Sequence, residues 1–106
     1  MIYAYPAGSV FDGLMGQYTA EDNYSMSITP VSDKSVQATI FTYTQTDTDI
    51  EQKLWTMIVK SNGSKLTYDK SKLEIYKNGE QTTKEAGKGS ITVKDGSLIW
   101  NNHTFK

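Results

Sequence analysis

Three dipeptides that favour tight hairpin turns divide the C-terminal half of the chain. They are Asn62-Gly63, Asn78-Gly79 and Asp95-Gly96. A two-residue type I′ turn needs positive φ at both central residues, and Asn, Asp and Gly tolerate that backbone conformation. The flanking segments alternate apolar and polar residues, as half-buried strands do. The sequence therefore predicts antiparallel hairpins between strands that are neighbours along the chain.

The same alternation runs through the N-terminal half, and turn residues interrupt it about every 8–12 positions, as in sandwiches and barrels. No stretch repeats apolar residues at helical spacing for three turns, so we expect no long helix. Because full closure removes aggregation-prone strand edges, we predict an antiparallel meander of about eight strands closed into a β-barrel. A β-sandwich is the alternative. The inward rows are expected to be Tyr24-Met26-Ile28, Val36-Ala38-Ile40, Trp55-Met57-Val59, Ile91-Val93 and Leu98-Trp100.

The chain has 106 residues, which is the size of one domain. We expect residues 1–12 to form a flexible N-terminal arm and residues 13–106 to form the single barrel domain. The segment Gln81–Gly87 is mostly polar. We expect it to be mobile.

Composition argues against several classes of partner. All 11 positively charged residues are Lys, and the net charge is −1. A near-neutral chain without Arg lacks the basic patch that binds nucleic acid. Apolar runs such as Met57-Ile58-Val59 are too short to span a bilayer. The absence of Cys removes disulfides and thiolate metal sites.

The inventory of catalytic side chains is small. The one His, His103, lies close to the C-terminus, where chain ends often fray, and we expect a solvated side chain. No Gly-x-Ser-x-Gly nucleophile motif accompanies it. Gly87-Lys88-Gly89 lacks the spacing and the following helix of a phosphate-binding loop. We therefore predict that the protein is not an enzyme and uses no cofactor.

The acidic cluster Asp47, Asp49 and Glu51 is interpreted as a solvated loop. Calcium loops need Gly and a bidentate Glu at positions that hold Gln52 and Ile58 here. No metal site is predicted.

The aromatic residues are the remaining candidates for a site. Trp55 and Trp100 fall on inward rows, where they either fill a small barrel or line a ligand cavity. Phe41 and Tyr43 fall out of phase with the inward residues of their own strand, which favours a surface patch. The candidate ligand-binding residues are therefore Tyr43, Phe41, Trp55 and Trp100.

Seven short segments occur in the order seen in a known group of proteins, and the resemblance covers the run from Phe11 to Asn101. The chain resembles small domains of lipoproteins and secreted proteins of gut Firmicutes that look like lipocalin-type β-barrels. The resemblance implies the barrel fold and an extracytoplasmic setting, and it implies no activity. The segments are Gly16-Gln-Tyr18, Met26-Ser-Ile28, Val36 to Ile40, Trp55, Leu66-Thr-Tyr68, Gly87-Lys-Gly89 and Asp95-Gly-Ser-Leu98-Ile-Trp100.

The chain departs from that group in two ways. It has no lipobox cysteine, and Asn101, Asn102 and His103 stand where an acidic residue usually follows the closing Trp. The first residues, Met1 to Ser9, lack the basic region and the long apolar region of a signal peptide. We expect a secreted or cell-surface protein whose signal or anchor is absent from this chain, or alternatively a cytoplasmic one.

The expected function is a binding module for a protein, a sugar or a small apolar ligand. The alternative is an inhibitor that presents the acidic loop Gln45–Glu51 to a secreted hydrolase such as lysozyme. A solvent-connected cavity in the barrel would favour a small ligand. A packed interior would favour a partner on the outer surface.

Overall fold

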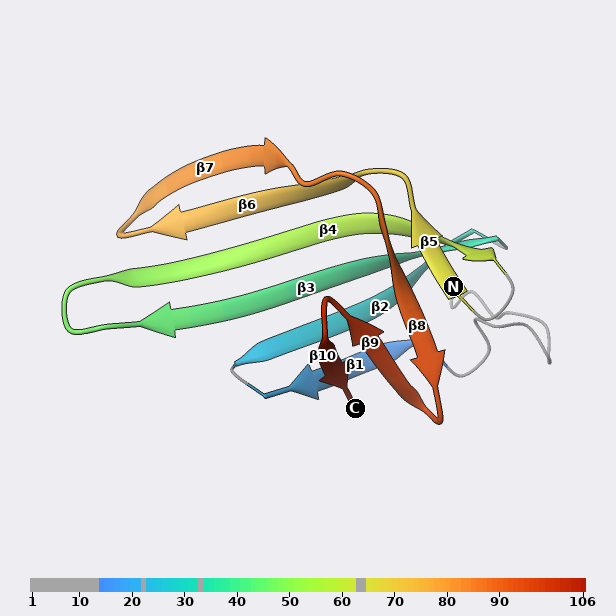
Figure 1. The fold of residues 1–106 in the computed structure, drawn as a ribbon. Coiled ribbons are helices and arrows are strands. Elements are labelled where there is room, and N and C mark those ends of the chain that lie inside the picture. The colour runs from blue at the N-terminus through green and yellow to red at the C-terminus, as the bar shows by residue number, and fades with distance from the viewer. Residues whose placement is uncertain (1–13, 22, 33, 63–64) are drawn as a thin grey trace.

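The computed structural model describes residues 14–21, 23–32, 34–62 and 65–106. The predicted N-terminal arm, residues 1–12, lies outside them. The described residues form antiparallel strands and no helix, so they contain no helix that could cross a membrane (Figure 1). The all-β prediction is confirmed. The strands are β1 Gly16–Ala20, β2 Tyr24–Ser32, β3 Ser35–Gln45, β4 Ile50–Asn62, β5 Lys65–Tyr68, β6 Ser71–Lys77, β7 Glu80–Glu85, β8 Gly89–Lys94, β9 Ser97–Trp100 and β10 His103–Phe105.

Eight of these strands follow a path that nearly closes into a barrel, in the order β1-β2-β3-β4-β5-β8-β9-β10. The two ends of the path meet where Thr19 and Lys106 exchange backbone hydrogen bonds of 3.1 and 2.9 Å. The predicted barrel of about eight strands is therefore confirmed, and the alternative sandwich does not form.

One step departs from a simple meander, because β5 pairs with β8 and not with β6. β4 is 13 residues long and pairs with two different strands along the same edge. Residues 51–57 of β4 pair with β6, whereas residues 60–62 pair with β5. β7 then pairs with β6 outside the barrel path.

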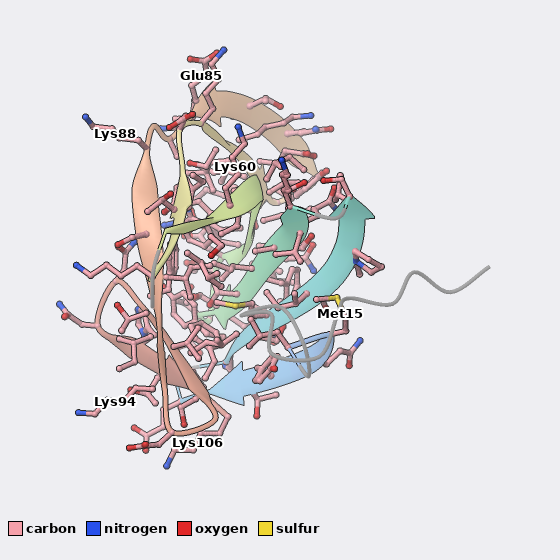
Figure 2. All side chains as sticks on the ribbon, turned by 90° about the vertical axis from the view of Figure 1, so that its right-hand side faces the viewer. Met15, Lys60, Glu85, Lys88, Lys94 and Lys106 are labelled. Carbon is pink, nitrogen blue, oxygen red and sulfur yellow. The ribbon has the colours of Figure 1, made fainter. Side chains whose placement is uncertain are left out.

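The outcome is a sheet that continues past the barrel, which we call the wing. It consists of residues 41–45 of β3, residues 50–55 of β4, and the whole of β6 and β7. Figure 1 shows these strands projecting away from β8, β9 and β10, and the molecule measures 49 × 27 × 24 Å. Seen along its long axis, the barrel strands curl around a shared interior (Figure 2).

The core lies inside the barrel and is built from the predicted inward rows. Alternation along each strand sends successive side chains to opposite faces, so one face of β2, β3 and β4 supplies this interior. Trp100 is 3% exposed. Half-buried Tyr24, Trp55 and Val93 pack against the core. The other buried apolar residues are Leu14, Met26, Ile28, Val36, Ala38, Ile40, Met57, Val59, Leu66, Tyr68, Ile91, Leu98 and Phe105.

Two of the predicted hairpin turns have the expected backbone. Asn78 and Gly79 have φ values of 52° and 87°, and Asp95 and Gly96 have values of 51° and 79°. Positive φ at both central residues is the requirement of a type I′ turn. Gly63 of the third predicted turn lies outside the described residues.

Most of the segment Gln81–Gly87, which we expected to be mobile, belongs to a strand, because Glu80–Glu85 form β7. All six residues of β7 are exposed. A strand with no buried face carries no apolar alternation, so the pattern that revealed the other strands is missing here.

Candidate functional site

The four predicted ligand-binding residues lie on opposite faces of the same sheet. Trp55 and Trp100 face the interior, with ring centroids 5.1 Å apart and ring planes at 65°. Phe41 and Tyr43 face outward, opposite Leu54 and Gln52 of β4, respectively. The structure therefore brings the residues together as two pairs and not as one site.

The inner pair belongs to the barrel core and its border. The indole N–H of the buried Trp100 donates a 2.9 Å hydrogen bond to the hydroxyl of Tyr68. Trp55 is only half-buried because it lies where β4 runs out of the barrel into the wing. This packing is what the core-filling interpretation of the two indoles requires. Ligand binding by them stays a prediction.

His103 is not the solvated terminal side chain that its position suggested. It begins β10, is half-buried, and stacks on Tyr24 with ring centroids 4.0 Å apart. Its ring is also 6.4 Å from that of Trp100 and 6.5 Å from that of Phe105. The expectation of fraying fails because β10 pairs with β9 and helps to close the barrel.

The outward residues of the wing form a second aromatic cluster, which we call the outer platform. Register places Phe41, Leu54 and Glu74 in one row across β3, β4 and β6. The neighbouring row holds Tyr43, Gln52 and Tyr76. The outer platform is defined as Phe41, Tyr43, Gln52, Leu54, Glu74 and Tyr76.

Hydrogen bonds order the polar members of the outer platform. The Tyr76 hydroxyl donates a 2.7 Å bond to Glu74, and the Gln81 amide donates a second bond of 3.3 Å to the same oxygen. Lys72 lies 3.4 Å from the other carboxylate oxygen. The bond from Tyr76, followed by the bond and charge of Lys72, holds the pKa of Glu74 below its usual value against an opposing effect of burial. Bonding to the Glu74 carboxylate and burial raise the pKa of Tyr76.

A surface hollow of about 780 Å³ adjoins the outer platform at the turn between β1 and β2. Phe41 and Tyr43 line it together with Asn23 and Ser25. The Asn23 amide lies 3.5 Å from the backbone oxygen of Tyr43, which links the turn to β3. The two surface aromatics that the sequence singled out therefore border both a flat face and a concavity.

Another hollow, of about 710 Å³, lies where the pairing of β4 changes from β6 to β5. Ile58, Lys60 and Lys72 are among its lining residues. A third, of about 620 Å³, lies beside β1 and β10, around Glu21 and His103. All three are open toward solvent and border the surface of the described part of the chain. Core side chains occupy the barrel interior.

The acidic loop forms a hairpin tip at the far end of the wing. Thr46 to Asp49 make the turn, with a 2.8 Å backbone bond from Thr46 to Asp49. The side chain of Asn78, from the neighbouring turn, donates a 2.9 Å bond to Asp49 and accepts one of 2.9 Å from the backbone of Ile50. Among the described residues, no group of three His, Asp or Glu side chains is placed to hold a metal ion.

The Gly87-Lys88-Gly89 segment has a structural role at the start of β8. A Cβ atom on Gly89 would lie 2.6 Å from Cζ of Tyr68. Glycine at this position therefore allows the Tyr68 ring to lie against the backbone and accept the bond from Trp100.

The fold and surfaces together define a small antiparallel β-barrel with a sheet extension. No family model, curated protein or solved structure matches the chain at a significant level. The resemblance to lipoprotein and secreted domains of gut Firmicutes stays a prediction.

Proposed function

We propose that this chain is a non-enzymatic binding module that acts outside the cytoplasm and holds a protein partner on its outer platform. One observation carries the proposal. Four large apolar residues of the described chain are exposed, and three of them, Phe41 at 36%, Ile50 at 44% and Ile58 at 44%, fall on the outward face of β3 and β4. Phe41 belongs to the outer platform, and Ile50 and Ile58 lie on the same face of β4 beyond its two ends. Exposed apolar side chains concentrated on one face, beside tyrosines, are typical of protein-binding surfaces.

The packed interior also favours an outer partner over a small ligand held within the barrel. The apolar core residues of the barrel are nearly inaccessible to solvent, so a ligand there would have to displace them. A protein partner can instead cover Phe41 and Tyr43 and exclude water from Leu54 without rearranging the core.

Site-specific photo-crosslinking tests this proposal. A photoreactive phenylalanine analogue replaces Phe41 in one variant and Val31 in a control, and both are exposed to surface and secreted proteins of the producing cells. Val31 is 50% exposed and lies outside the outer platform. We expect a discrete protein adduct from position 41 and none from position 31.

Affinity measurements with the crosslinked protein complete the test. Phe41→Ser and Tyr43→Ser should each weaken binding at least about tenfold, since buried aromatic anchors dominate interface energies. Val31→Ser should leave binding unchanged. Equal yields of adduct from positions 41 and 31 would refute the proposal. So would Phe41→Ser and Tyr43→Ser variants that bind the partner as tightly as the wild type does. If the wild-type protein is retained on a polysaccharide and the Tyr43→Ser variant is not, the partner is a glycan and not a protein.

A second candidate function is inhibition of a secreted hydrolase, and the geometry of the hairpin tip favours it. Asp47 is exposed and Asp49 is held by Asn78 at the projecting end of the wing. A rigid acidic tip is complementary to a basic active-site cleft. Lysozyme activity measured with excess protein tests this directly. Unchanged activity excludes inhibition of lysozyme.

Extracytoplasmic localisation is part of the proposal and has its own test. It is supported by the resemblance described above and by the abundance of Ser, Thr, Tyr, Asn and Lys. Fractionation of the producing cells should find the protein in the envelope or the medium. Recovery in the cytoplasm alone would refute it.

A further inference from the structure

β7 is an edge strand with a partner on one side only. It pairs with β6 and with no other described strand, and all six of its residues are exposed. In Figure 1 it forms the upper border of the wing, and Figure 2 shows Glu85 at the outermost rim of the molecule. The ends of the barrel sheet, in contrast, close on each other. A free edge of this kind accepts another strand unless something blocks it.

The hairpin geometry determines which backbone groups of β7 are free. The two-residue turn makes Lys77 and Glu80 a hydrogen-bonded pair. Hydrogen-bonded pairs then recur at every second residue, at Thr82 and Lys84 of β7. The 2.9 Å bond from the backbone N–H of Ala86 continues this series.

The intervening residues therefore direct their backbone groups toward the free edge. The N–H and C=O groups of Gln81, Thr83 and Glu85 point away from β6. An antiparallel partner must place similarly free groups opposite Gln81 and Thr83. β7 contains neither a proline nor a bulge, which are two of the features that block pairing at a free edge.

We propose that β7 pairs antiparallel with β7 of a second copy of this chain, about a two-fold axis at Thr82. In this register Gln81 lies opposite Thr83 of the second copy, and the symmetry repeats this pair. Both residues present free backbone groups, so hydrogen bonds can form on both sides of the axis. Glu85 lies beyond these pairs, opposite Gly79 in the turn. A two-fold axis between Thr82 and Thr83 would pair a free residue with an occupied one and form no ladder.

Charge complementarity selects this register among those that the hydrogen bonds allow. Glu80 lies opposite Lys84 of the second copy, and the symmetry makes the same pair twice. If the axis is shifted to Gln81 or to Thr83, Glu80 and Lys84 each face an uncharged residue of the second copy. Directly opposed charges of unlike sign stabilise antiparallel pairs, whereas like charges destabilise them.

The product is one continuous sheet through both wings, in the order β3-β4-β6-β7 and then the same strands reversed. It carries two outer platforms on one face of the joined sheet. The pairing does not rest on the proposed function, because its argument uses only the backbone and charges of β7. A ladder of six residues per chain buries less surface than a stable dimer interface, so we expect a weak, concentration-dependent dimer.

Sedimentation velocity over a concentration series tests the proposal. The wild-type protein should shift from monomer toward dimer by about 1 mM. Thr83→Pro should abolish the dimer, because it removes an N–H that points to the free edge. It leaves the bonds to β6 intact, and proline is tolerated on edge strands. Thr83→Val retains the N–H and is the matched control. Circular dichroism and tryptophan fluorescence verify that each variant folds.

Charge reversal tests the register. Glu80→Lys and Lys84→Glu should each raise the dimer dissociation constant about tenfold, since each variant opposes like charges twice. An equimolar mixture of the two variants should dimerise as the wild type does, because both opposed pairs are then complementary. A wild-type protein that remains monomeric at about 1 mM overturns the proposal. So does a dimer that survives Thr83→Pro, or a mixture that fails to recover.

Discussion

The contact between Gly89 and Tyr68 makes a sharp prediction about stability. The backbone at Gly89 does not have positive φ, so alanine is conformationally permitted there. On backbone grounds alone, Gly89→Ala should stabilise the protein by about 0.4–1 kcal/mol through the entropy of the unfolded chain. The contact predicts the opposite sign. A Cβ atom would lie 2.6 Å from Cζ of Tyr68, and the ring is buried.

The cost has two parts. Overpacking of a core contact costs about 1–3 kcal/mol. If the ring moves, the buried N–H of Trp100 loses its 2.9 Å bond to the Tyr68 hydroxyl, and an unpaired buried donor costs about 1–3 kcal/mol. After subtraction of the entropic gain, the middle of these ranges gives a destabilisation of about 3 kcal/mol for Gly89→Ala.

Urea unfolding monitored by tryptophan fluorescence measures this effect. The midpoint should fall by about 1–2 M urea. Gly87→Ala is the control, because Gly87 has a φ of 82° and a Cβ atom there would meet nothing within 4 Å beyond its chain neighbours. It therefore reports backbone strain without a clash. A Gly89→Ala protein as stable as the wild type would refute the reasoning.

A double-mutant cycle tests whether the cost acts through the Tyr68 hydroxyl. Tyr68→Phe removes the acceptor of the Trp100 bond and also the atom that lies nearest the Cβ position of Gly89. The substitution should itself cost about 1–3 kcal/mol. In that background the bond is already lost and the clash is smaller, so Gly89→Ala should cost less than it does in the wild type. We expect a coupling energy of about 1 kcal/mol or more. Strict additivity would show that the hydroxyl does not carry the cost.

Four further predictions concern the wing and the barrel end. The lowered pKa of Glu74 contributes to the free energy of unfolding above the usual carboxyl pKa, and this contribution is lost as the pH falls through the lowered value. Glu74→Gln should therefore reduce the loss of stability at acid pH, as measured by urea unfolding at a series of pH values. Raising the pH through the raised pKa of Tyr76 should likewise remove a contribution that is present below the usual tyrosine pKa. Asn78→Gly keeps the positive φ but loses both side-chain bonds, and faster amide exchange at the tip should follow without global unfolding. His103→Ala should lower the free energy of unfolding by about 0.5–1.5 kcal/mol, since it removes the stack on Tyr24, whereas a solvated side chain would give no change.

The faces of the strands could be predicted from sequence because the side-chain period of a strand is two. Alternation correctly placed Phe41 on the outward face of its strand, Ile40 on the inward face, and Trp100 inside the barrel. It failed for β7, where no apolar residue marks either face.

β10 was missed for a different reason, although a signal was present. Asn101 and Asn102 have φ values of 47° and 67° and connect Trp100 to His103 across a two-residue turn. Asparagine is enriched at positive φ, so Asn-Asn after an apolar strand is a hairpin signal like Asn-Gly. Recognising it would have predicted that His103 belongs to a strand.

Strand partners could not be predicted from local patterns, and β4 shows why. Trp55, Met57 and Val59 form one alternating row that gives no hint of a boundary. Yet Met57 and Val59 are buried by the barrel, whereas Trp55 is only half-buried, because the strand changes partners from β6 to β5 between residues 57 and 60. Alternation determines the face of a residue, but position relative to the barrel rim determines its burial. The rim depends on β8 returning to β5, a long-range pairing that no window of the sequence contains. The exposed outward face of the wing is a consequence of that pairing, which is why its extent required the structure.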